Sequence, residues 1–285
     1  MAVIALDVGG TNIRAALVSR NKIVRRAVSR TVTKRGSKGL LAAIRAAVIS
    51  VKGRGIEGIG VSIAGEIKGG IVLSSPNLPL KNYPLAARLR QLFRVPVRIE
   101  NDAKCFLLGE QHHGIARKTR HAVGITLGTG LGGSVVSEGT LLRGRGQAGH
   151  LGHMIISVDG RKCSCGSHGC LEEYVSARAL MRYAHGLKAG NPEEVYRLAL
   201  RGNPKARAAF RKFGHYLGIA MSNIVNLFDP DIIVVGGNIS KAWKFFLPKA
   251  RATMKALAWL DHLPAVRKSK LGDDAALLGA AGLLA

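Results

Sequence analysis

Three of the chain's four cysteines, Cys163, Cys165 and Cys170, lie within a stretch of eight residues, and His153 precedes the first of them by ten positions. Glycines inside the stretch allow the backbone to reverse tightly. Three thiolates and one imidazole are ligands that tetrahedral zinc prefers, and a closed set of this kind is typical of a structural site. The alternative is a disulfide in a secreted protein, but one bond cannot use three thiols. We therefore predict a zinc site.

Length and composition bound the class of protein. The 285 residues suffice for two domains, although one large domain stays open. The sequence shows neither a basic segment followed by a short apolar one, typical of a signal peptide, nor an apolar run near twenty residues long. We expect a soluble, cytoplasmic protein. Thiols then lie in a reducing compartment, which favours metal binding over disulfides.

The formal net charge of +26 arises from 43 basic and 17 acidic residues. Such a charge attracts anions, so it could indicate nucleic-acid binding, a surface that gathers nucleotide and sugar phosphates, or only the composition typical of the host. Aromatic residues make up 5% of the chain, and the basic residues are scattered from Arg20 to Lys270. Because stacking rings do not alternate with the basic residues, we do not expect a dedicated nucleic-acid role.

A glycine turn follows the first apolar stretch of the chain. Residues 2–8 read as a buried strand, Gly9 and Gly10 as a tight turn, and residues 13–18 as a second strand. Backbone amides in such a turn suit phosphate. The carboxylate of Asp7 could hold a hydrated Mg²⁺, Thr11 could donate a hydroxyl, and Arg14 could neutralise phosphate charge. An ordinary hairpin is the alternative.

The pattern recurs in the middle of the chain. Residues 122–127 form an apolar run, glycines follow at 128–133, and the strand resumes at 134–136. When the two hairpins are aligned, Thr126 takes the position of Asp7. Only the first hairpin therefore has a carboxylate at this position, and we expect metal to bind there. Two such hairpins could grip a polyphosphate from both sides. A third glycine pair, Gly236 and Gly237, follows the strand at 232–235 and could let a purine approach the backbone.

Asp102 lies between a predicted strand at 95–99 and a predicted helix at 103–113, which is where α/β proteins place ligands. The alternative is an N-cap aspartate without chemistry. Further strands are predicted at 22–28 and 56–63, and Pro76, Asn77 and Pro79 indicate a loop. We expect both tryptophans, Trp243 and Trp259, to pack in the core. Helices are predicted at 37–51, 85–93, 177–187, 192–200, 204–227, 243–259 and 273–285. The order of elements favours an α/β fold with mixed sheets and helices on their faces.

Taken together, these segments resemble a known superfamily. Residues 7–14, the turn at 127–130 and residues 235–237 resemble the two phosphate segments and the adenosine segment of the sugar kinase, actin and heat-shock-chaperone superfamily. The set His153, Cys163, Cys165, Cys170 and Glu172 resembles the signature of the ROK family (repressors, open reading frames, kinases). The resemblance runs from residue 3 to the last helix.

The resemblance implies a two-lobed, actin-like ATPase (ribonuclease H-like) fold with a cleft between the lobes. One lobe would span residues 1–102 plus 272–285 and the other, with the zinc site, residues 103–271. It also suggests a homodimer that binds no membrane. The implied phosphate and ATP contacts are Asp7, Gly9, Gly10, Thr11, Asn12, Arg14, Gly128, Thr129, Gly130, Gly236 and Gly237.

The resemblance also implies roles around a sugar. Asn101 would hold sugar hydroxyls, and Asp102 would accept the proton of the attacking hydroxyl. His153 would bind zinc through one nitrogen and the sugar through the other, and Glu172 would accept hydroxyl protons. Gly65 would be a loop contact near the sugar. The implied reaction is transfer of the terminal phosphoryl group of ATP, with Mg²⁺, to the 6-hydroxyl of a hexose or N-acetylhexosamine.

One position departs from the family pattern. Many glucokinases of the family have Glu three residues before the zinc histidine, where this chain has His150. An imidazole offers one donor and one acceptor, whereas a carboxylate accepts two hydroxyl protons. A histidine there is similar to some N-acetylmannosamine kinases, although the animal enzyme of that class has Glu, so the substitution leans toward N-acetylmannosamine. A glucokinase or broad hexokinase is the alternative.

Two other functions stay open at this point. A sugar-sensing ROK transcription regulator would carry a helix-turn-helix before the kinase-like part, and we disfavour it because the first phosphate strand starts at residue 2 or 3. A kinase that accepts polyphosphate as well as ATP would suit the basic surface.

Overall fold

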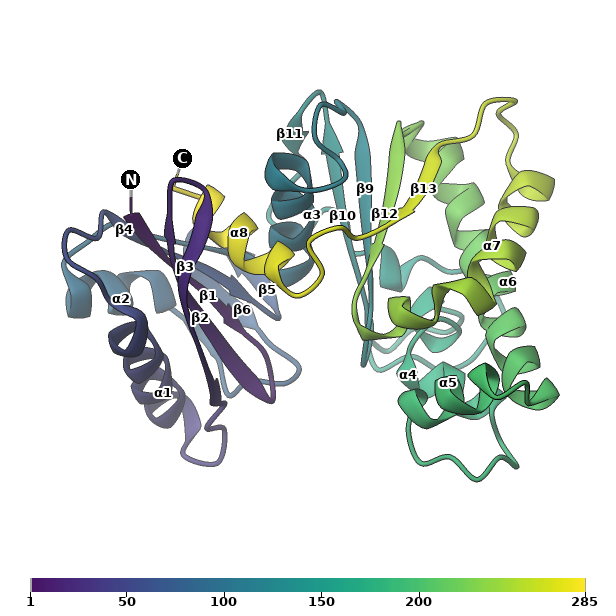
Figure 1. Ribbon diagram of the computed structural model, residues 1–285, viewed down its shortest axis with the longest axis horizontal. Helices are drawn as coiled ribbons and strands as arrows, with labels where there is room; N and C mark the ends of the chain where they lie inside the picture. The colour runs from purple at the N-terminus through teal and green to yellow at the C-terminus, as the bar shows by residue number, and fades with distance from the viewer. Residues whose placement is uncertain (1, 285) are drawn as a thin grey trace. The chain divides into compact units, whose positions relative to one another are not determined.

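The computed structural model describes residues 2–284, which divide into two compact units. The first unit contains residues up to 118 together with 141–148 and the residues from 269 onward, and the second contains 119–140 and 149–268. Each unit is built around one five-stranded sheet (Figure 1). No helix among the described residues combines the length and apolar character that crossing a bilayer requires.

The sheet of the first unit has the order β3-β2-β1-β4-β8. Strands β1, β4 and β8 run parallel, whereas β2 and β3 form an antiparallel meander with β1. The strands are β1 (Ala2–Val8), β2 (Asn12–Ser19), β3 (Lys22–Arg30), β4 (Gly58–Ile63) and β8 (Val97–Asn101). The helices of this unit are α1 (Gly36–Val51), α2 (Leu85–Phe93), α3 (Asp102–His113) and α8 (Asp274–Gly282).

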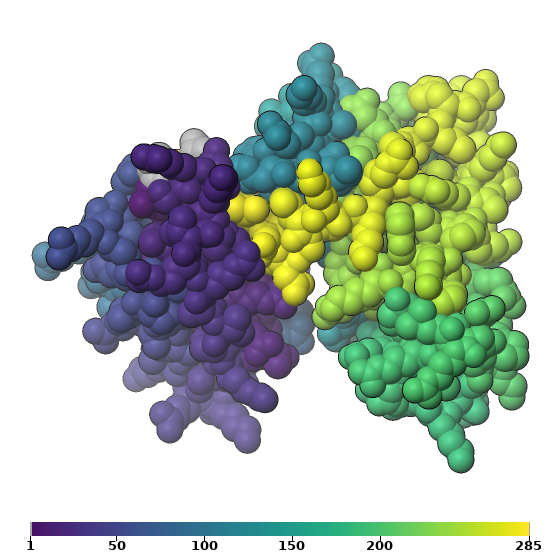
Figure 2. All heavy atoms as spheres, viewed as in Figure 1, coloured from purple at the N-terminus to yellow at the C-terminus, as the bar shows by residue number. Residues whose placement is uncertain are grey.

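Alternating residues of β1 enter two different cores. Ile4, Leu6 and Val8 pack with α1 and α2, whereas Val3 and Ala5 pack with α8. This alternation is the period-two pattern of a strand that is buried on both faces. In Figure 2 the yellow atoms of α8 accordingly lie against the purple atoms of the opening strands.

Helix α3 belongs to the first unit, which differs from the boundary expected at residue 102. Glycines explain the difference, because they let α3 and α8 touch along their backbones. A Cβ on Gly109 would lie 2.0 Å from the Ala275 carbonyl oxygen, and one on Gly279 would lie 1.8 Å from that of Cys105. This close packing on α8 accounts for the place of α3 in the first unit.

The sheet of the second unit has the order β11-β10-β9-β12-β13. Its strands are β9 (Ala122–Leu127), β10 (Leu131–Ser137), β11 (Thr140–Leu141), β12 (Ile232–Gly236) and β13 (Ala265–Lys268). The α-helices are α4 (Ala177–Tyr183), α5 (Pro192–Leu200), α6 (Pro204–Phe228) and α7 (Trp243–Leu257), and 3₁₀ turns span Leu151–His153, Leu171–Glu173 and Asn238–Ala242. The predicted repeat is confirmed, because in both sheets an antiparallel hairpin (β1–β2, β9–β10) lies beside two strands that run parallel to its first strand.

Several local predictions were wrong. A small sheet of β5 (Glu66–Lys68), β6 (Ile71–Ser74) and β7 (Lys81–Tyr83) was not predicted, because strands of three or four residues are too short to show a period. Helix α4 ends at Tyr183 and not at 187. Trp243 packs against the core of its unit, but Trp259 follows the end of α7 and is 84% exposed, so its predicted burial was wrong.

Candidate active site

The carboxyl ends of three parallel strands meet in the first unit. Asp7 pairs with Ser62 in the register of β1 and β4, and Ile63 pairs with Asn101 in that of β4 and β8. The carboxyl edge of a parallel sheet is where open α/β folds bind ligands. Asp7, Gly65 and the consecutive residues Asn101 and Asp102, which come from three separate segments of the sequence, therefore lie at one edge of one sheet.

Asp7 is held by two neighbours. The Ser62 hydroxyl donates to Asp7 Oδ1 at 2.9 Å, and Arg14 Nη1 lies 3.4 Å from Asp7 Oδ2. Burial raises the pKa of the Asp7 carboxyl, and the Ser62 hydrogen bond and the Arg14 charge oppose that rise. Arg14 also faces Asp273, at 3.7 Å. A partly buried carboxylate beside a glycine turn is an oxygen ligand of the kind that Mg²⁺ uses.

The first glycine turn spans four residues. The Gly9 N–H donates to the Asn12 carbonyl at 3.0 Å, and the Thr31 hydroxyl and N–H donate to the carbonyls of Gly9 and Thr11 at 2.7 and 2.9 Å. Thr11 and Asn12 are exposed. Because its carbonyls are already bound by Thr31, the turn has a fixed backbone that could present amides to an anion.

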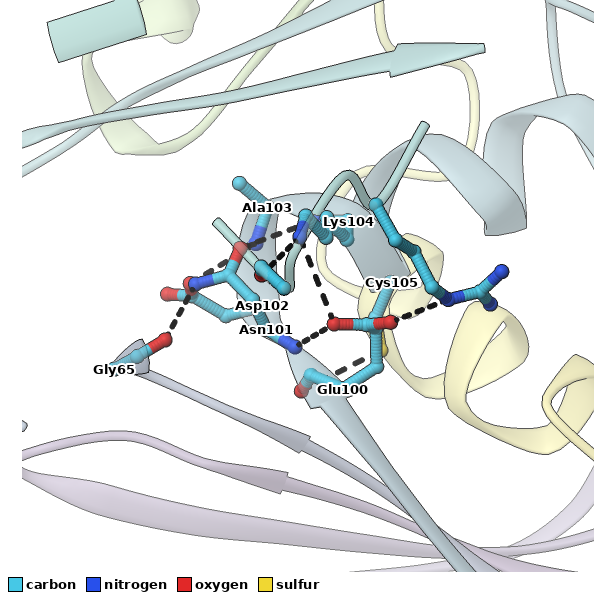
Figure 3. A network of polar contacts seen from close by, with 9 residues as sticks. Gly65, Glu100, Asn101, Asp102, Ala103, Lys104 and Cys105 are labelled. Carbon is cyan, nitrogen blue, oxygen red and sulfur yellow. Dashed lines mark hydrogen bonds and ion pairs between the residues drawn. The ribbon is translucent and has the colours of Figure 1, made fainter. Parts of the chain in front are cut away.

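Asn101 is the N-cap of α3, and Asp102 is the first residue of the helix. The Asn101 Oδ1 accepts from the N–H groups of Ala103 and Lys104 at 3.0 and 3.2 Å, and its Nδ2 donates to the Gly65 carbonyl at 3.1 Å (Figure 3). The alternative reading of Asp102 as an N-cap aspartate was therefore wrong, because Asn101 is the cap.

Asp102 is half-buried and accepts a hydrogen bond from the Ala103 N–H at 2.9 Å. Burial raises the pKa of its carboxyl, the charge of Asp7 raises it further, and the hydrogen bond from Ala103 opposes the rise. A carboxylate with a raised pKa at a strand end has the properties of a general base.

The four predicted zinc ligands come together in the second unit. One donor atom from each of His153, Cys163, Cys165 and Cys170 lies within 4.8 Å of all the others. His153 Nδ1 is 4.0 Å from Cys163 Sγ, and the Sγ atoms of Cys165 and Cys170 are 3.6 Å apart. None of the four cysteines forms a disulfide. Three thiols and one imidazole nitrogen within this radius fit a tetrahedral Zn²⁺.

The thiols of this cluster differ in acidity. The Ser167 N–H lowers the pKa of Cys165, whereas burial raises the pKa of Cys170 to about 12. Zinc binds thiolates, so its binding at this cluster would release protons.

Glycines fix the backbone around the cluster. Gly169 has φ +74°, and a Cβ there would lie 1.7 Å from the Ser157 carbonyl oxygen. A Cβ on Gly152 would lie 2.5 Å from the Leu131 carbonyl oxygen, and one on Gly133 would lie 2.4 Å from that of Gly149. The segment that carries His150 and His153 thus packs directly on β10, and their rings lie 6.3 Å apart, edge to face.

The turn of the second hairpin is shorter than the run of glycines at 128–133 suggested. This turn contains only residues 128–130, because β10 begins at Leu131, so Gly132 and Gly133 lie in the strand and not in the turn. In the strand register the second loop is one residue shorter than the first, because Leu127 pairs with Leu131 whereas Val8 pairs with Ile13. The Gly128 N–H donates to the Gly130 carbonyl at 3.0 Å, and the Gly128 carbonyl accepts from the Ala177 N–H at 2.9 Å.

Glu172 lies beside this turn. Its Oε2 accepts a hydrogen bond from the Leu131 N–H at 2.8 Å. The third glycine pair lies at the same end of the sheet, because Gly236 pairs with Thr126. Gly237 has φ +81°, and a Cβ there would lie 2.3 Å from the Leu127 carbonyl oxygen, so contact with β9 alone already requires a glycine. An adenosine contact at this pair stays a prediction.

The candidate residues form two groups. The first unit holds Asp7, Gly9, Gly10, Thr11, Asn12, Arg14, Gly65, Asn101 and Asp102, and the second holds Gly128, Thr129, Gly130, His150, His153, Cys163, Cys165, Cys170, Glu172, Gly236 and Gly237. Sequence reasoning missed Ser62, Glu100 and Lys104, all of which contact predicted site residues or their neighbours. Ser62 lies near the end of the strand beside that of Asp7, and Glu100 and Lys104 lie near or just beyond the end of the strand that leads into Asp102. These positions are what could have identified them from the sequence.

Comparison with known proteins fits this geometry. The chain is 33% identical over 310 residues to a glucokinase of Thermotoga maritima, covering 100% of this chain and 97% of the relative. It is also 33% identical over 246 residues to a xylose repressor of Caldicellulosiruptor bescii, covering 79% of this chain and 62% of the repressor.

Solved structures give the same result for the fold. The chain is similar to a ROK family glucokinase from Streptomyces griseus in complex with glucose and AMPPNP, with a TM-score of 0.88, 32% identity and 99% of each chain covered. It is also similar to a putative N-acetylmannosamine kinase from Listeria monocytogenes, with a TM-score of 0.84, 26% identity, and 98% of this chain and 97% of that chain covered. The predicted α/β fold of the actin-like kinases is thereby confirmed. Because the model of the ROK family matches residues 3–285, this chain belongs to the ROK family.

Proposed function

We propose that the protein is an ATP-dependent sugar kinase that transfers the terminal phosphoryl group to the 6-hydroxyl of a hexose or N-acetylhexosamine. One observation carries this proposal: Asp102, with a raised pKa, lies at the same sheet edge as Asp7 and the first glycine turn. A base beside a candidate cation and phosphate site is what phosphoryl transfer to an alcohol requires.

In the proposed reaction Asp102 accepts the proton of the sugar hydroxyl. The hydroxyl oxygen forms a bond to the terminal phosphorus of ATP as the bond from that phosphorus to the bridging oxygen breaks, which leaves ADP and the sugar phosphate. Mg²⁺, when bound, would spread the charge that develops on the phosphate oxygens, and Asp7 would hold it through water. Arg14 and the amides of the first turn would bind phosphate oxygens.

The zinc cluster has a different role in this proposal. Zn²⁺ would be held by His153 Nδ1 and the three thiols, and a closed site of this kind stabilises structure. A ligated imidazole keeps one orientation, so His153 would present its other nitrogen to the sugar. Glu172, two residues after Cys170, would accept sugar hydroxyl protons.

The sugar itself is the open specificity question. The near full-length likeness to a glucokinase supports glucose as the first substrate to test. His150, in place of the Glu of many glucokinases, supports including N-acetylmannosamine. The test is a coupled assay of ADP release with ATP and Mg²⁺ across glucose, mannose, fructose, N-acetylglucosamine and N-acetylmannosamine, with inorganic polyphosphate as a second donor. Zinc-loaded, folded protein that phosphorylates none of them would refute the proposal.

The likeness to a xylose repressor supports one rival, a sugar-sensing regulator. The net charge of +26 is the feature that favours it. A regulator would bind operator-like DNA at physiological salt and leave ATP intact in the presence of sugar, whereas we expect turnover and only salt-sensitive, non-specific DNA binding.

A further inference from the structure

A buried lysine lies beside the candidate base. The side chain of Lys104, in the first turn of α3, is 1% exposed. Its Nζ donates to the Gly146 carbonyl at 2.7 Å and lies 4.0 Å from Glu100 Oε1. Lysine is rarely buried to this degree without a partner, and these two contacts are the partners that compensate its burial.

Glu100 joins this lysine to the base segment. Its Oε1 accepts from the Asn101 N–H at 2.9 Å, and its Oε2 accepts from Arg143 Nε at 2.9 Å. Figure 3 shows the Glu100 carboxylate between Lys104 and the backbone of Asn101, with Asp102 next along the chain. The charges of Lys104 and Arg143 thus converge on one carboxylate at the start of α3.

Lys104 and Glu100 each contact the same short segment, through Gly146 and Arg143 respectively. Gly146 and Arg143 lie in residues 141–148, which belong to the first unit although the residues on either side of them belong to the second. A third contact, from Gln147 Nε2 to Glu66 Oε2 at 2.9 Å, also ties this segment to the first unit. The chain leaves the segment at residue 149 and continues directly into His150 and His153.

We propose that Lys104, through Gly146 and Glu100, is a positioning residue that fixes the start of α3 and the segment leading to His150 relative to each other. The proposal rests on the proposed sugar kinase function for its kinetic consequence. Loss of the Lys104 contacts should misplace both the proton acceptor Asp102 and the segment that leads to His150. The nucleotide contacts around Asp7 should stay in place.

The test is Lys104→Met, which keeps the length of the side chain and removes its charge and donor. We expect kcat to fall on the order of 10- to 100-fold and the sugar KM to rise by about tenfold, while the ATP KM changes by less than about twofold. Hydrogen exchange should rise at residues 141–150 and stay unchanged in α1. Wild-type kcat and sugar KM in this variant would overturn the proposal.

Two further variants separate positioning from stability. Val48→Ala removes a buried side chain of α1 in the same unit, and it should lower the melting temperature and leave all three kinetic constants near wild type. The same kinetic pattern in Val48→Ala as in Lys104→Met would refute a positioning role. Lys104→Met combined with Glu100→Gln also removes the carboxylate charge that Arg143 alone would otherwise balance, and its kinetic defect should persist because Gly146 still lacks its donor. Full kinetic recovery would overturn the role of the Lys104–Gly146 bond.

Failure of the kinase proposal would be visible separately. Wild-type protein that turns over no sugar would refute the proposed function. Hydrogen exchange would then test by itself whether Lys104 holds residues 141–150 in place. Unchanged exchange at 141–150 in Lys104→Met would overturn the positioning role.

Discussion

The carboxylate of Glu172 accepts a hydrogen bond from the Leu131 N–H at 2.8 Å, and so joins the zinc cluster to the second glycine turn. Glu172 follows the zinc-ligand candidate Cys170 by two residues, and Leu131 begins the strand after the turn. A Cβ on Gly130 would lie 2.2 Å from Glu172 Oε2, so the turn leaves room for this carboxylate. A residue predicted only to bind sugar also supports a candidate phosphate-binding turn.

Glu172 substitutions should separate these two tasks. Glu172→Gln keeps an oxygen that can accept from Leu131 but removes the charge, so the sugar KM should rise by about tenfold while the ATP KM stays near wild type. Glu172→Ala removes the acceptor as well, so the ATP KM should also rise. Steady-state kinetics with each substrate varied would measure both effects. An unchanged ATP KM in Glu172→Ala would show that the turn does not depend on this bond.

Zinc should be present at one ion per chain and should stabilise the segment from 149 to 173. We expect Cys163→Ser to lose zinc, to increase hydrogen exchange in that segment and to weaken sugar binding first. Elemental analysis, exchange and calorimetry with sugar would measure these effects. The matched control is Cys105→Ser, because Cys105 is buried in the first unit outside the cluster. Full zinc content in Cys163→Ser, or undiminished sugar affinity after verified zinc loss, would contradict the orienting role.

Features that depend on local pattern could be predicted from the sequence. The apolar runs of β1, β9 and β12, the glycine turns after them and the Cys-rich segment each carry their signal within a few residues. The repeat of the first hairpin by the second was also predicted, because the two apolar runs and their glycines can be aligned, whereas the order of the strands within each sheet was not predicted.

Features that depend on contacts between distant residues could not be predicted. The glycine at 133 was placed in a turn, although contact with Gly149 requires it. Helix α3 was expected to open the second lobe, whereas it groups with the first unit, where it packs on α8. Lys104 looked like an ordinary charged helix residue, because its partner Gly146 lies 42 positions away.

Asp102→Asn should abolish turnover and stabilise the protein. The pKa of Asp102 is raised by burial and then by Asp7, so the folded state favours the protonated carboxyl over the ionised one. The stability that this preference contributes is present below the unfolded pKa and is lost as pH rises through the raised, folded pKa. At neutral pH the ionised Asp102 therefore destabilises the fold, and the neutral Asn removes that effect.

Thermal unfolding of both proteins across pH would measure this. We expect the melting temperature of Asp102→Asn to exceed that of wild type at pH 7, by roughly 2–4 °C for each kcal/mol relieved, and the difference to vanish in acid. Sugar binding by calorimetry should largely survive. In wild type, kcat/KM should fall on the acidic side at a pH above the ordinary range of an aspartate. Near-normal turnover by Asp102→Asn would exclude this residue as the base.

His150→Glu should shift sugar preference toward glucose. His150 lies beside His153 on the segment that packs on β10 through Gly149 and Gly152, and neither glycine contact involves the His150 side chain. A carboxylate accepts from two hydroxyls, whereas a neutral imidazole accepts from one and donates to one. One hydrogen bond to a charged group contributes about 1.5–3 kcal/mol, so the ratio of kcat/KM for glucose over N-acetylmannosamine should rise at least about tenfold.

The ratio must be measured for both sugars with the same enzyme preparation, because a general loss of activity would lower both values together. His185→Glu is the matched control, since it makes the same change at an exposed histidine just after α4 that is not among the four clustered residues, and it should leave the ratio unchanged. Zinc content should stay at the wild-type level in both variants, because His150 is not among the four clustered ligands. A constant ratio in zinc-loaded His150→Glu would show that this position does not set the preference between the two sugars, and that the departure from the family pattern there has no effect on which of them is chosen.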